Sequence, residues 1–252
     1  MRLLAPRFLA TAALAVLLPV AAVAGEQVEY TVNGETFTGY RAEAVGESKG
    51  LVLVIHDWDG LTGYEEKRAD MLAELGYDAF AVDLYGKGNR PVETGAKKAE
   101  TGKLYQDRER MRALILGGLA EARKASDGET VVMGYCFGGA ATLELARSGK
   151  AENVAGYATF HGGLSTPEGQ SYAADTAPIL VAHGGADAAI PMSQVAALSE
   201  ELEKAGVTYE IQVYSGAPHA FTVFGSDRYR EVADTKSWNA FTGFLATNLA
   251  TE

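Results

Sequence analysis

The residue of this sequence best placed for covalent chemistry is a cysteine between glycines. Three apolar residues, Val131–Met133, lead into Gly-Tyr-Cys-Phe-Gly at Gly134–Gly138, and residues 140–146 then follow a helical pattern. A strand, a sharp turn and a helix in this order are typical of a nucleophile elbow, where glycines leave room that a β-carbon would fill. Free N–H groups at the helix start would favour the thiolate of Cys136 and offer a donor to an oxyanion. The simpler alternative is a small, buried hydrophobic cysteine.

An acidic residue and a histidine follow later in the chain, each just after a predicted strand. Asp187 comes after the apolar run 178–182, and His219 comes after the alternating run 209–214. A thiolate attacks an acyl carbon, an imidazole takes and returns its proton, and a carboxylate fixes the imidazole tautomer. The order Cys136, Asp187, His219 therefore fits a triad of nucleophile, acid and base. Taken singly, Asp187 also suits a turn, and His219 suits a loop histidine bonded to backbone.

The elements that must position these residues alternate between strands and helices. Asn33-Gly34 separates two alternating segments, 28–32 and 36–41, which predicts an antiparallel hairpin. The later pattern predicts an α/β fold with a mostly parallel, doubly wound sheet, whose ligands bind beyond the carboxyl ends of the strands. Residues 87–103 are polar and contain glycine, which predicts a long loop with some helix. Strands are expected at 50–55, 79–82, 131–133, 154–160, 178–182 and 209–214, and helices at 64–75, 108–124, 140–146, 192–205 and 232–249.

The first 24 residues have the pattern of a targeting segment. Arg2 and Arg7 precede an uncharged apolar run that ends in Ala22-Val23-Ala24. A basic start, an apolar middle and an A-x-A end predict a cleaved signal peptide over 1–24, and hence export to the periplasm or secretion. An uncleaved membrane anchor is the alternative. Residues 25–252 contain no linker or internal repeat, so we expect a single domain there.

Composition narrows the classes of partner. The 252 residues carry a formal net charge of −11 and one cysteine. An acidic chain is a poor candidate for binding nucleic acid or an anionic membrane surface, and a single cysteine excludes an internal disulfide. We expect a small-molecule substrate, no stable membrane insertion after signal cleavage, and a monomer or weak homodimer.

Other residues with ligand chemistry give weaker patterns. His56, His161 and His183 each end a predicted strand and could bind zinc with a nearby aspartate. They lie on separate strands without a short ligand spacing, so we expect no metal. Gly184-Gly185 could cradle a phosphate, but the rest of a phosphate-binding motif is missing and a simple turn is favoured.

Five motifs, in this order, resemble the dienelactone hydrolase family of α/β-hydrolases. They are His56–Leu61, Ala81–Gly86, Gly134–Gly139, His183–Asp187 and Gly216–Phe221. The resemblance implies an α/β-hydrolase fold and a triad of Cys136, Asp187 and His219. It also implies hydrolysis of an ester or lactone, as in carboxymethylenebutenolidases, without metal or organic cofactor.

The resemblance assigns further roles around the thiol. Asp57 stands where the family usually has a glutamate near the resting thiol, so Asp57 is expected to oppose ionisation of Cys136 at neutral pH. Backbone N–H groups of Trp58 and Phe137 are expected to form the oxyanion hole.

The expected substrate pocket departs from that of enzymes acting on dienelactone itself. Lys87 and Val223 stand where those enzymes have arginines, which predicts a preference for neutral substrates over the small anionic lactone. Aromatic residues at strand ends are expected to line the pocket, namely Trp58, Tyr85, Phe160 and Phe221. Two alternatives stay open. One is an acyltransferase or thioesterase with the same triad, and the other is a non-catalytic, ligand-binding relative whose thiol is structural or redox-sensing.

Overall fold

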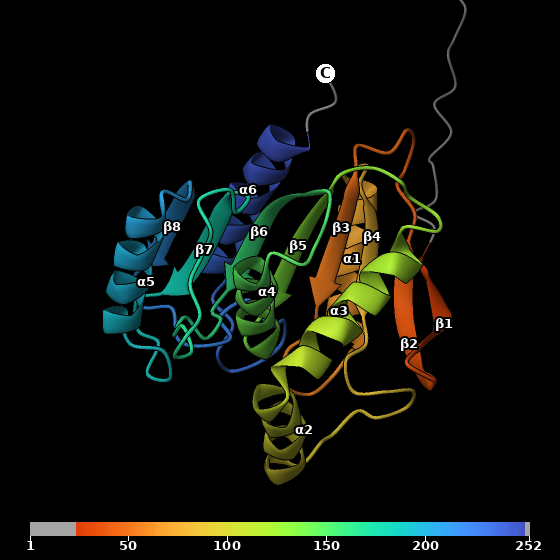
Figure 1. The fold of residues 1–252 in the computed structure, drawn as a ribbon, viewed down its shortest axis with the longest axis horizontal. Helices are drawn as coiled ribbons and strands as arrows, with labels where there is room; N and C mark the ends of the chain where they lie inside the picture. The colour runs from red at the N-terminus through yellow and green to blue at the C-terminus, as the bar shows by residue number, and fades with distance from the viewer. Residues whose placement is uncertain (1–23, 250–252) are drawn as a thin grey trace, which may run out of the picture.

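The computed structural model describes residues 24–249 and arranges them as an eight-stranded sheet between two layers of helices (Figure 1). The strand order is β1-β2-β4-β3-β5-β6-β7-β8. The predicted signal peptide, except for Ala24, lies outside the described residues. Within residues 24–249, no helix is long and apolar enough to cross a membrane. The strands are β1 (Glu26–Val32), β2 (Glu35–Ala42), β3 (Leu51–Ile55), β4 (Asp78–Val82), β5 (Thr130–Tyr135), β6 (Val154–Phe160), β7 (Ile179–Gly184) and β8 (Tyr209–Tyr214).

The predicted hairpin is confirmed at one edge of the sheet. Strands β1 and β2 pair antiparallel and close on Val32 opposite Glu35. Asn33 and Gly34 between them have φ of 51° and 82°, as a type I′ turn requires. Strand β2 joins β4 antiparallel, and from β4 through β3 to β8 every pairing is parallel. The predicted α/β class with an N-terminal antiparallel hairpin is therefore confirmed.

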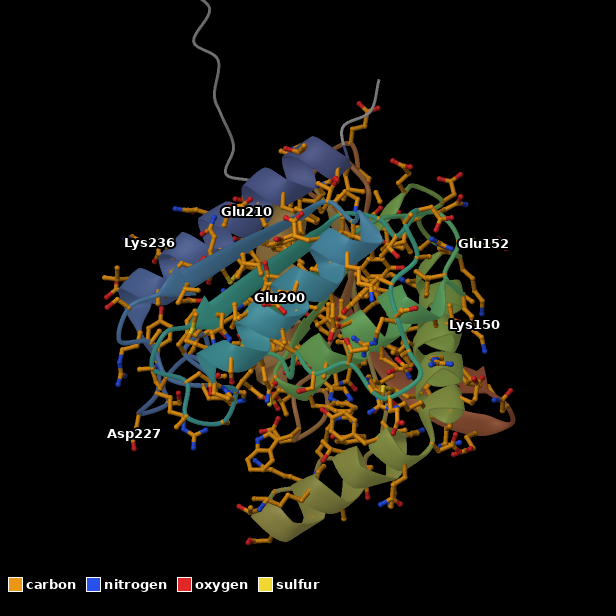
Figure 2. All side chains as sticks on the ribbon, turned by 60° about the vertical axis from the view of Figure 1, so that its left-hand side comes forward. Lys150, Glu152, Glu200, Glu210, Asp227 and Lys236 are labelled. Atoms are coloured by element: carbon orange, nitrogen blue, oxygen red, sulfur yellow. The ribbon has the colours of Figure 1, made fainter. Side chains whose placement is uncertain are left out.

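Helices cover both faces of the parallel strands. Every residue of β3 and β5 is buried, as the unbroken apolar runs predicted. Apolar side chains of α3, α4 and α5 form the core on one face, and those of α1 and α6 form the core on the other. Charged side chains point outward, such as Glu200 on α5 and Lys236 on α6 (Figure 2). The helices are α1 (Gly63–Glu74), α2 (Thr94–Gln106), α3 (Arg108–Ala122), α4 (Phe137–Ser148), α5 (Met192–Ala205) and α6 (Glu231–Asn248).

The segment predicted as a long loop with some helix is mostly helical. Helix α2 covers Thr94–Gln106 and ends at Asp107, whose side chain caps α3 by accepting from the Arg110 N–H. The sequence did not predict the full helix because the segment lacks an apolar stripe. Leu104 is the one residue of α2 that is buried. Helix α2 lies beyond the carboxyl ends of the strands (Figure 1). It is therefore placed to cover whatever binds there.

A buried carboxylate ties the helix behind the cysteine to its neighbours. Glu144 on α4 has a fully buried side chain and accepts hydrogen bonds from Arg108 (2.7 Å) and Arg112 (2.9 Å) on α3. Arg147 on α4 adds a third guanidinium at 3.3 Å. Burial raises the pKa of Glu144, but these cations outweigh burial and hold it below its usual value. Helix α4 is therefore locked against α3 by charge as well as by apolar packing.

Removing this carboxylate should destabilise the fold. We expect Glu144→Ala to lower the free energy of unfolding by about 3–5 kcal/mol, because it leaves three buried or half-buried cations without their common partner. Urea denaturation measures the change. Glu35→Ala, which breaks an exposed pair with Arg110, is the matched control and should change little. Equal losses in the two variants would show that Glu144 is not a buried anchor.

Candidate active site

The turn between β5 and α4 holds Cys136 in a strained backbone conformation. Cys136 has φ of 51° and ψ of −111°, a combination that costs a residue with a β-carbon about 1–3 kcal/mol. The flanking glycines make the turn fit. A β-carbon on Gly138 would lie 2.2 Å from the carbonyl oxygen of Ile55, and one on Gly134 would lie 2.2 Å from that of Gly138. The junction has the geometry of a nucleophile elbow, packed against the end of β3.

The three residues predicted to act together lie in one line of contacts. His219 Nε2 lies 3.1 Å from the sulfur of Cys136, and His219 Nδ1 lies 2.8 Å from an oxygen of Asp187. Cys136 follows β5, Asp187 follows β7 and His219 follows β8, so parallel strands deliver all three to one edge of the sheet. This arrangement can move a proton from the thiol to the imidazole while a carboxylate holds the far nitrogen.

Asp187 is fixed from both sides. Its Oδ1 accepts from the backbone N–H groups of Ala189 (2.8 Å) and Ile190 (2.9 Å), and its Oδ2 contacts His219. Burial raises the pKa of Asp187, but the hydrogen bonds from His219 and the two N–H groups outweigh burial and lower it overall. Asp187 therefore stabilises the turn, as its sequence context predicted, and also presents an ionised carboxylate to the imidazole of His219.

The thiol does not have the lowered pKa expected from its place at a helix start. Burial, followed by the charge of Asp57, raises the pKa of Cys136 to about 12. The backbone N–H of Phe137 favours the thiolate, but its effect is smaller. Desolvation and nearby carboxylates therefore outweigh the helix terminus, and Cys136 rests as a protonated thiol that needs a base to activate it.

A cluster of carboxyl groups lies beside the thiol. Asp57 accepts from the Asp59 N–H (3.0 Å), and its own N–H donates to Glu65 (3.3 Å), a buried residue on α1 that also accepts from Thr62. Burial, with hydrogen bonding to Asp59 and the charge of Glu65, raises the pKa of Asp57 to about 9. Burial likewise raises the pKa of Glu65 to about 7. A pKa of about 9 leaves Asp57 largely neutral at pH 7, so the expectation that it opposes thiol ionisation by its charge at neutral pH is corrected.

Sequence reasoning missed Glu65 in this cluster, although a signal was present. Thr62 and Glu65 form a capping box at the start of α1, with the Thr62 N–H and hydroxyl both 2.9 Å from the Glu65 carboxylate. The T-x-x-E spacing that predicts such a box is readable in the sequence. The burial of Glu65 beside Asp57 depends on tertiary packing, which the T-x-x-E spacing does not predict.

The two expected oxyanion donors lie on the two sides of the junction between β3 and the elbow. The N–H of Phe137 is directed at the sulfur of Cys136. The N–H of Trp58 makes no hydrogen bond with any of the residues 24–249, while the N–H groups of Asp57 and Asp59 beside it are both engaged. Two free backbone donors flanking a thiol are the chemistry that an oxyanion requires.

The aromatic residues predicted to line a pocket divide into two groups. Trp58 and Tyr85 are half-buried, and the Tyr85 hydroxyl donates to the Trp58 carbonyl at 3.2 Å. Phe160 and Phe221 are instead core residues, 1% and 0% exposed. They pack beneath the site because β6 and the histidine loop turn these side chains toward α6 and β8. Val223 is half-buried on the histidine loop.

Lys87 is paired with the hairpin at the edge of the sheet. Its ammonium lies 2.5 Å from Glu29 on β1, both side chains are more than half exposed, and its N–H donates to the Thr36 carbonyl on β2. The hairpin therefore engages Lys87, through its ammonium on Glu29 and its backbone N–H on Thr36.

Helix α2 supplies two residues that the sequence did not reveal. The ring of Tyr105 packs edge-on against Phe137 with centroids 5.4 Å apart. Burial, followed by the charge that Cys136 acquires when it ionises, raises the pKa of Tyr105 to about 12. Lys97 lies 3.2 Å from Asp59 and 5.3 Å from the centre of the Trp58 ring. These contacts fasten α2 over the thiol, and no periodic pattern in its sequence predicted them.

Two other histidines at this edge, His56 and His161, form hydrogen bonds within the fold. His56 bonds the Asp57 carbonyl through Nδ1 (2.6 Å) and accepts from the Leu84 N–H through Nε2 (3.1 Å). His161 bonds the Thr222 hydroxyl at 2.8 Å. The described residues contain no group of three or more histidine, cysteine or acidic side chains placed to hold a metal ion.

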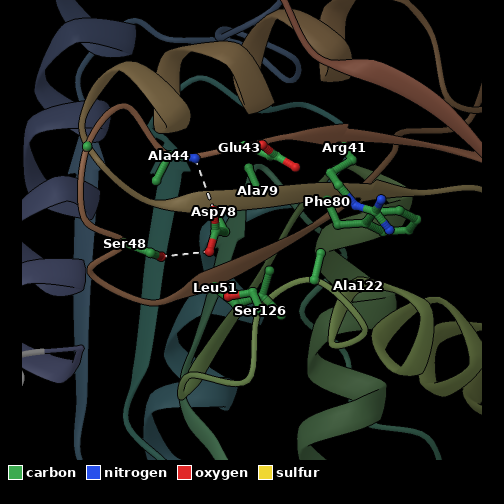
Figure 3. Close-up of a pocket in the computed structure, with 12 residues that line it drawn as sticks. Arg41, Glu43, Ala44, Ser48, Leu51, Asp78, Ala79, Phe80, Ala122 and Ser126 are labelled. Atoms are coloured by element: carbon green, nitrogen blue, oxygen red, sulfur yellow. Dashed lines mark hydrogen bonds between the residues drawn. The ribbon is translucent and has the colours of Figure 1, made fainter.

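A separate cavity of about 280 Å³ lies at the opposite edge of the sheet (Figure 3). Its wall includes Arg41, Glu43 and Asp78, and Asp78 bonds the Ala44 N–H and the Ser48 hydroxyl. The lining residues Leu51 and Asp78 begin β3 and β4, and Arg41 and Glu43 lie at the end of the antiparallel strand β2, whereas Cys136 follows the carboxyl end of β5. The cavity is therefore no part of the site around the thiol.

Comparison with known protein families identifies the family of this chain. The model of the dienelactone hydrolase family matches residues 37–249. The chain belongs to the dienelactone hydrolase family. Family membership makes it a hydrolase with an α/β-hydrolase fold, as the motifs around the thiol, the acid and the histidine predicted.

Individual proteins that resemble this chain differ from it at most positions. A Bradyrhizobium protein named as a probable 2-oxo-3-(5-oxofuran-2-ylidene)propanoate lactonase is 26% identical over 86% of this chain and 92% of its own length. A dienelactone hydrolase-like promiscuous phosphotriesterase from metagenomic libraries is 27% identical, with a TM-score of 0.79 over 89% of this chain and 98% of that one. An acylaminoacyl peptidase of Pyrococcus horikoshii shares the fold at 16% identity, a TM-score of 0.70, 90% of this chain and 42% of that one.

The raised pKa of Asp57 predicts how it affects the thiol. Asp57 is largely neutral at pH 7 and becomes charged as the pH rises through about 9, when its charge would oppose thiolate formation. We expect Asp57→Asn and wild type to be alkylated by iodoacetamide at similar rates at pH 7. Above pH about 9 the variant should react several-fold faster, because it cannot acquire the opposing charge.

The control for this comparison is an exposed carboxylate remote from the thiol. Glu35→Gln should leave the alkylation rate of Cys136 unchanged at both pH values, since Glu35 is exposed on β2 and paired with Arg110. A constant ratio of Asp57→Asn to wild-type rates from pH 7 to 10 would show that Asp57 does not titrate beside the thiol.

Proposed function

We propose that this hydrolase cleaves small carboxylic esters or lactones through a Cys136–His219–Asp187 triad and a thioester intermediate. The observation that carries the proposal is the unbroken line of contacts from Asp187 through His219 to Cys136, at 2.8 and 3.1 Å, at a strained elbow. We also propose, from the pattern of residues 1–24, that the chain acts after export to the periplasm or outside the cell.

The first half-reaction forms the thioester. Because Cys136 rests protonated, His219 takes the thiol proton as the sulfur attacks the acyl carbon. The carbonyl oxygen becomes an oxyanion and accepts from the N–H groups of Trp58 and Phe137. The carbon–oxygen bond to the alcohol then breaks, and His219 returns its proton to the leaving oxygen. In a lactone, the leaving hydroxyl stays attached to the acyl group.

The second half-reaction restores the thiol. His219 takes a proton from water, the hydroxide attacks the thioester carbon, and the same N–H donors hold the oxyanion. The carbon–sulfur bond breaks, the carboxylic acid leaves, and the sulfur regains its proton from His219. Asp187 stabilises the imidazolium in both halves, because its lowered pKa keeps the carboxylate ionised.

The charges around the site favour a neutral substrate. Lys87 is paired with Glu29, and Lys97 is paired with Asp59. Arg230 on the histidine loop is exposed and bonds the carbonyls of Asp227 and Tyr229. A substrate carboxylate would meet carboxyl groups near the thiol and cations that already have partners. Desolvating an anion without a new partner costs several kcal/mol, which outweighs weak surface attraction.

Activity should depend on the triad. We expect Cys136→Ala or His219→Ala to lower kcat for a p-nitrophenyl ester by on the order of a thousandfold or more, and Asp187→Asn to lower it somewhat less. Stopped-flow assays with folded variants measure the loss. A Cys136→Ala variant that kept more than about a tenth of wild-type turnover would overturn the proposed mechanism.

Substrate charge should change the rate more than substrate size. We expect kcat/KM for p-nitrophenyl hexanoate to exceed that for the p-nitrophenyl half-ester of adipic acid by about a hundredfold, since the two acyl chains differ by one carboxylate. Val223→Arg should narrow the gap, and Val223→Leu is the matched control without a charge. Faster turnover of the anionic ester by wild type would contradict the expected neutral pocket.

A further inference from the structure

A buried histidine directly precedes the peptide group expected to supply one of the oxyanion donors. His56 follows β3, is fully buried, and packs its ring edge-on against Tyr85 with centroids 4.6 Å apart. Its Nδ1 lies 2.6 Å from the carbonyl oxygen of Asp57, and its Nε2 lies 3.1 Å from the backbone nitrogen of Leu84. The ring therefore bridges the segment after β3 and the segment after β4.

The two backbone partners fix the tautomer of His56. A backbone N–H only donates, so Nε2 accepts from Leu84 and carries no proton. A carbonyl oxygen only accepts, so Nδ1 carries the proton and donates it to Asp57. Neither assignment depends on a hydroxyl group that could turn. A second proton on the ring would meet the Leu84 N–H head on, so His56 is neutral in the folded protein.

The N–H of Leu84 is itself held in place. The preceding residue, Asp83, has a fully buried carboxylate whose Oδ1 accepts from the Tyr85 N–H at 3.0 Å. Its Oδ2 accepts from the Thr38 N–H on β2 at 3.2 Å. The backbone is thus anchored on both sides of Leu84, and the donor that sets the His56 tautomer cannot turn away without breaking these bonds.

The Asp57 carbonyl and the Trp58 N–H belong to one peptide group. Residues 24–249 contain no cis peptide bond, and in a planar trans peptide the C=O and the N–H point in opposite directions. By holding the carbonyl on its own side, His56 turns the Trp58 N–H to the other side. If the peptide group turned over, it would present a carbonyl oxygen where a donor is needed, and that oxygen would repel an oxyanion.

The elbow packs against the same segment. A β-carbon on Gly138 would lie 2.5 Å from the His56 carbonyl oxygen, so the start of α4 lies against the backbone of His56. The rings of His56 and Phe137 have centroids 6.0 Å apart. Phe137 supplies the other expected donor, so His56 lies where the two sides of the oxyanion hole meet.

We propose that His56 is a positioning residue for the oxyanion hole, and that its Nδ1–H orients the Asp57–Trp58 peptide group through the Asp57 carbonyl. The inference rests on the proposed thioester mechanism. The Trp58 N–H interacts most strongly with the acyl oxygen once that oxygen is charged. A misdirected peptide should therefore slow the chemical steps more than it weakens substrate binding.

The charged groups around His56 agree with a neutral ring. Burial lowers the pKa of His56, the bond to the Asp57 carbonyl and the charge of Asp83 act in the opposite sense, Arg90 lowers the pKa, and Asp59 raises it. Burial has the largest effect, and the pKa lies below its usual value. The bond to Asp57 therefore persists at neutral pH.

Long-range ¹H–¹⁵N NMR of histidine-labelled protein tests the tautomer without turnover. The chain has four histidines, and the spectrum of His56→Asn identifies the signals of His56. We expect a protonated Nδ1, an unprotonated Nε2 and no titration of His56 between about pH 6 and 9. A proton on Nε2 in this range would show that His56 does not orient the peptide in the way proposed.

Three substitutions of His56 separate its donor from its bulk. The Asn side chain places an amide N–H near the Nδ1 position, the Gln side chain reaches the Nε2 position and keeps an acceptor for Leu84, and Leu has neither group. We expect His56→Leu and His56→Gln to lower kcat for a p-nitrophenyl ester about a hundredfold, with KM changed by less than about twofold. His56→Asn should lose less than about tenfold. Equal losses in His56→Asn and His56→Gln, or full activity in His56→Gln, would refute the role.

Alkylation of the thiol distinguishes a misplaced donor from a disrupted site. Iodoacetamide reacts with Cys136 without forming an oxyanion, so the alkylation rate in His56→Gln should stay within about twofold of wild type. A parallel loss of alkylation and turnover would mean that His56 supports the fold in general, which contradicts the proposal. Turnover by Cys136→Ala would defeat the thioester mechanism itself, whereas an inactive Cys136→Ala beside a fully active His56→Gln would defeat the positioning role alone.

Discussion

The left-handed backbone of Cys136 is the constraint on which the rest of this site depends. A residue with a β-carbon holds φ of 51° only where its surroundings leave no alternative, and here glycines on both sides let α4 approach β3 to within backbone contact. That approach sets the sulfur between the end of β3, with its free Trp58 N–H, and the start of α4, with the Phe137 N–H. Because β7 and β8 run parallel to β5, the segments that follow them bring Asp187 and His219 to the same edge of the sheet.

Most titratable groups around the thiol are uncharged before substrate binds. Burial leaves the thiol protonated, Asp57 largely neutral at pH 7 and the strand-end histidines His56, His161 and His183 uncharged. Asp187 stays ionised because hydrogen bonds outweigh its burial. Charge therefore develops mainly during the reaction, on His219 and on the acyl oxygen, where an ionised carboxylate and backbone donors are already in place. Preorganised partners of this kind stabilise a transition state without having to reorient.

Local patterns predicted much of this structure. Asn33-Gly34 predicted the hairpin, and continuous apolar runs predicted β3 and β5. The segments that follow three strand ends placed Cys136, Asp187 and His219 at one edge. What sequence could not give depends on tertiary packing. Helix α2 has no apolar stripe, so Tyr105 and Lys97 were not expected over the thiol. Whether an aromatic residue at a strand end lines a pocket or fills the core depends on the direction of its side chain. The side chains of Phe160 and Phe221 lie in the core. Likewise, proximity to a helix start suggested a lowered thiol pKa, but the extent of burial decided the direction.

The most direct test of this account is to trap the acyl group on the sulfur. Rapid quenching of the wild-type enzyme with a slowly hydrolysed p-nitrophenyl ester, followed by peptide mass spectrometry, should find one acyl group on the peptide containing Cys136. The adduct should be released by neutral hydroxylamine, as a thioester is, and should be absent from Cys136→Ala. Turnover without any acyl adduct on Cys136, or an equal adduct on another residue in both proteins, would contradict covalent catalysis by this cysteine.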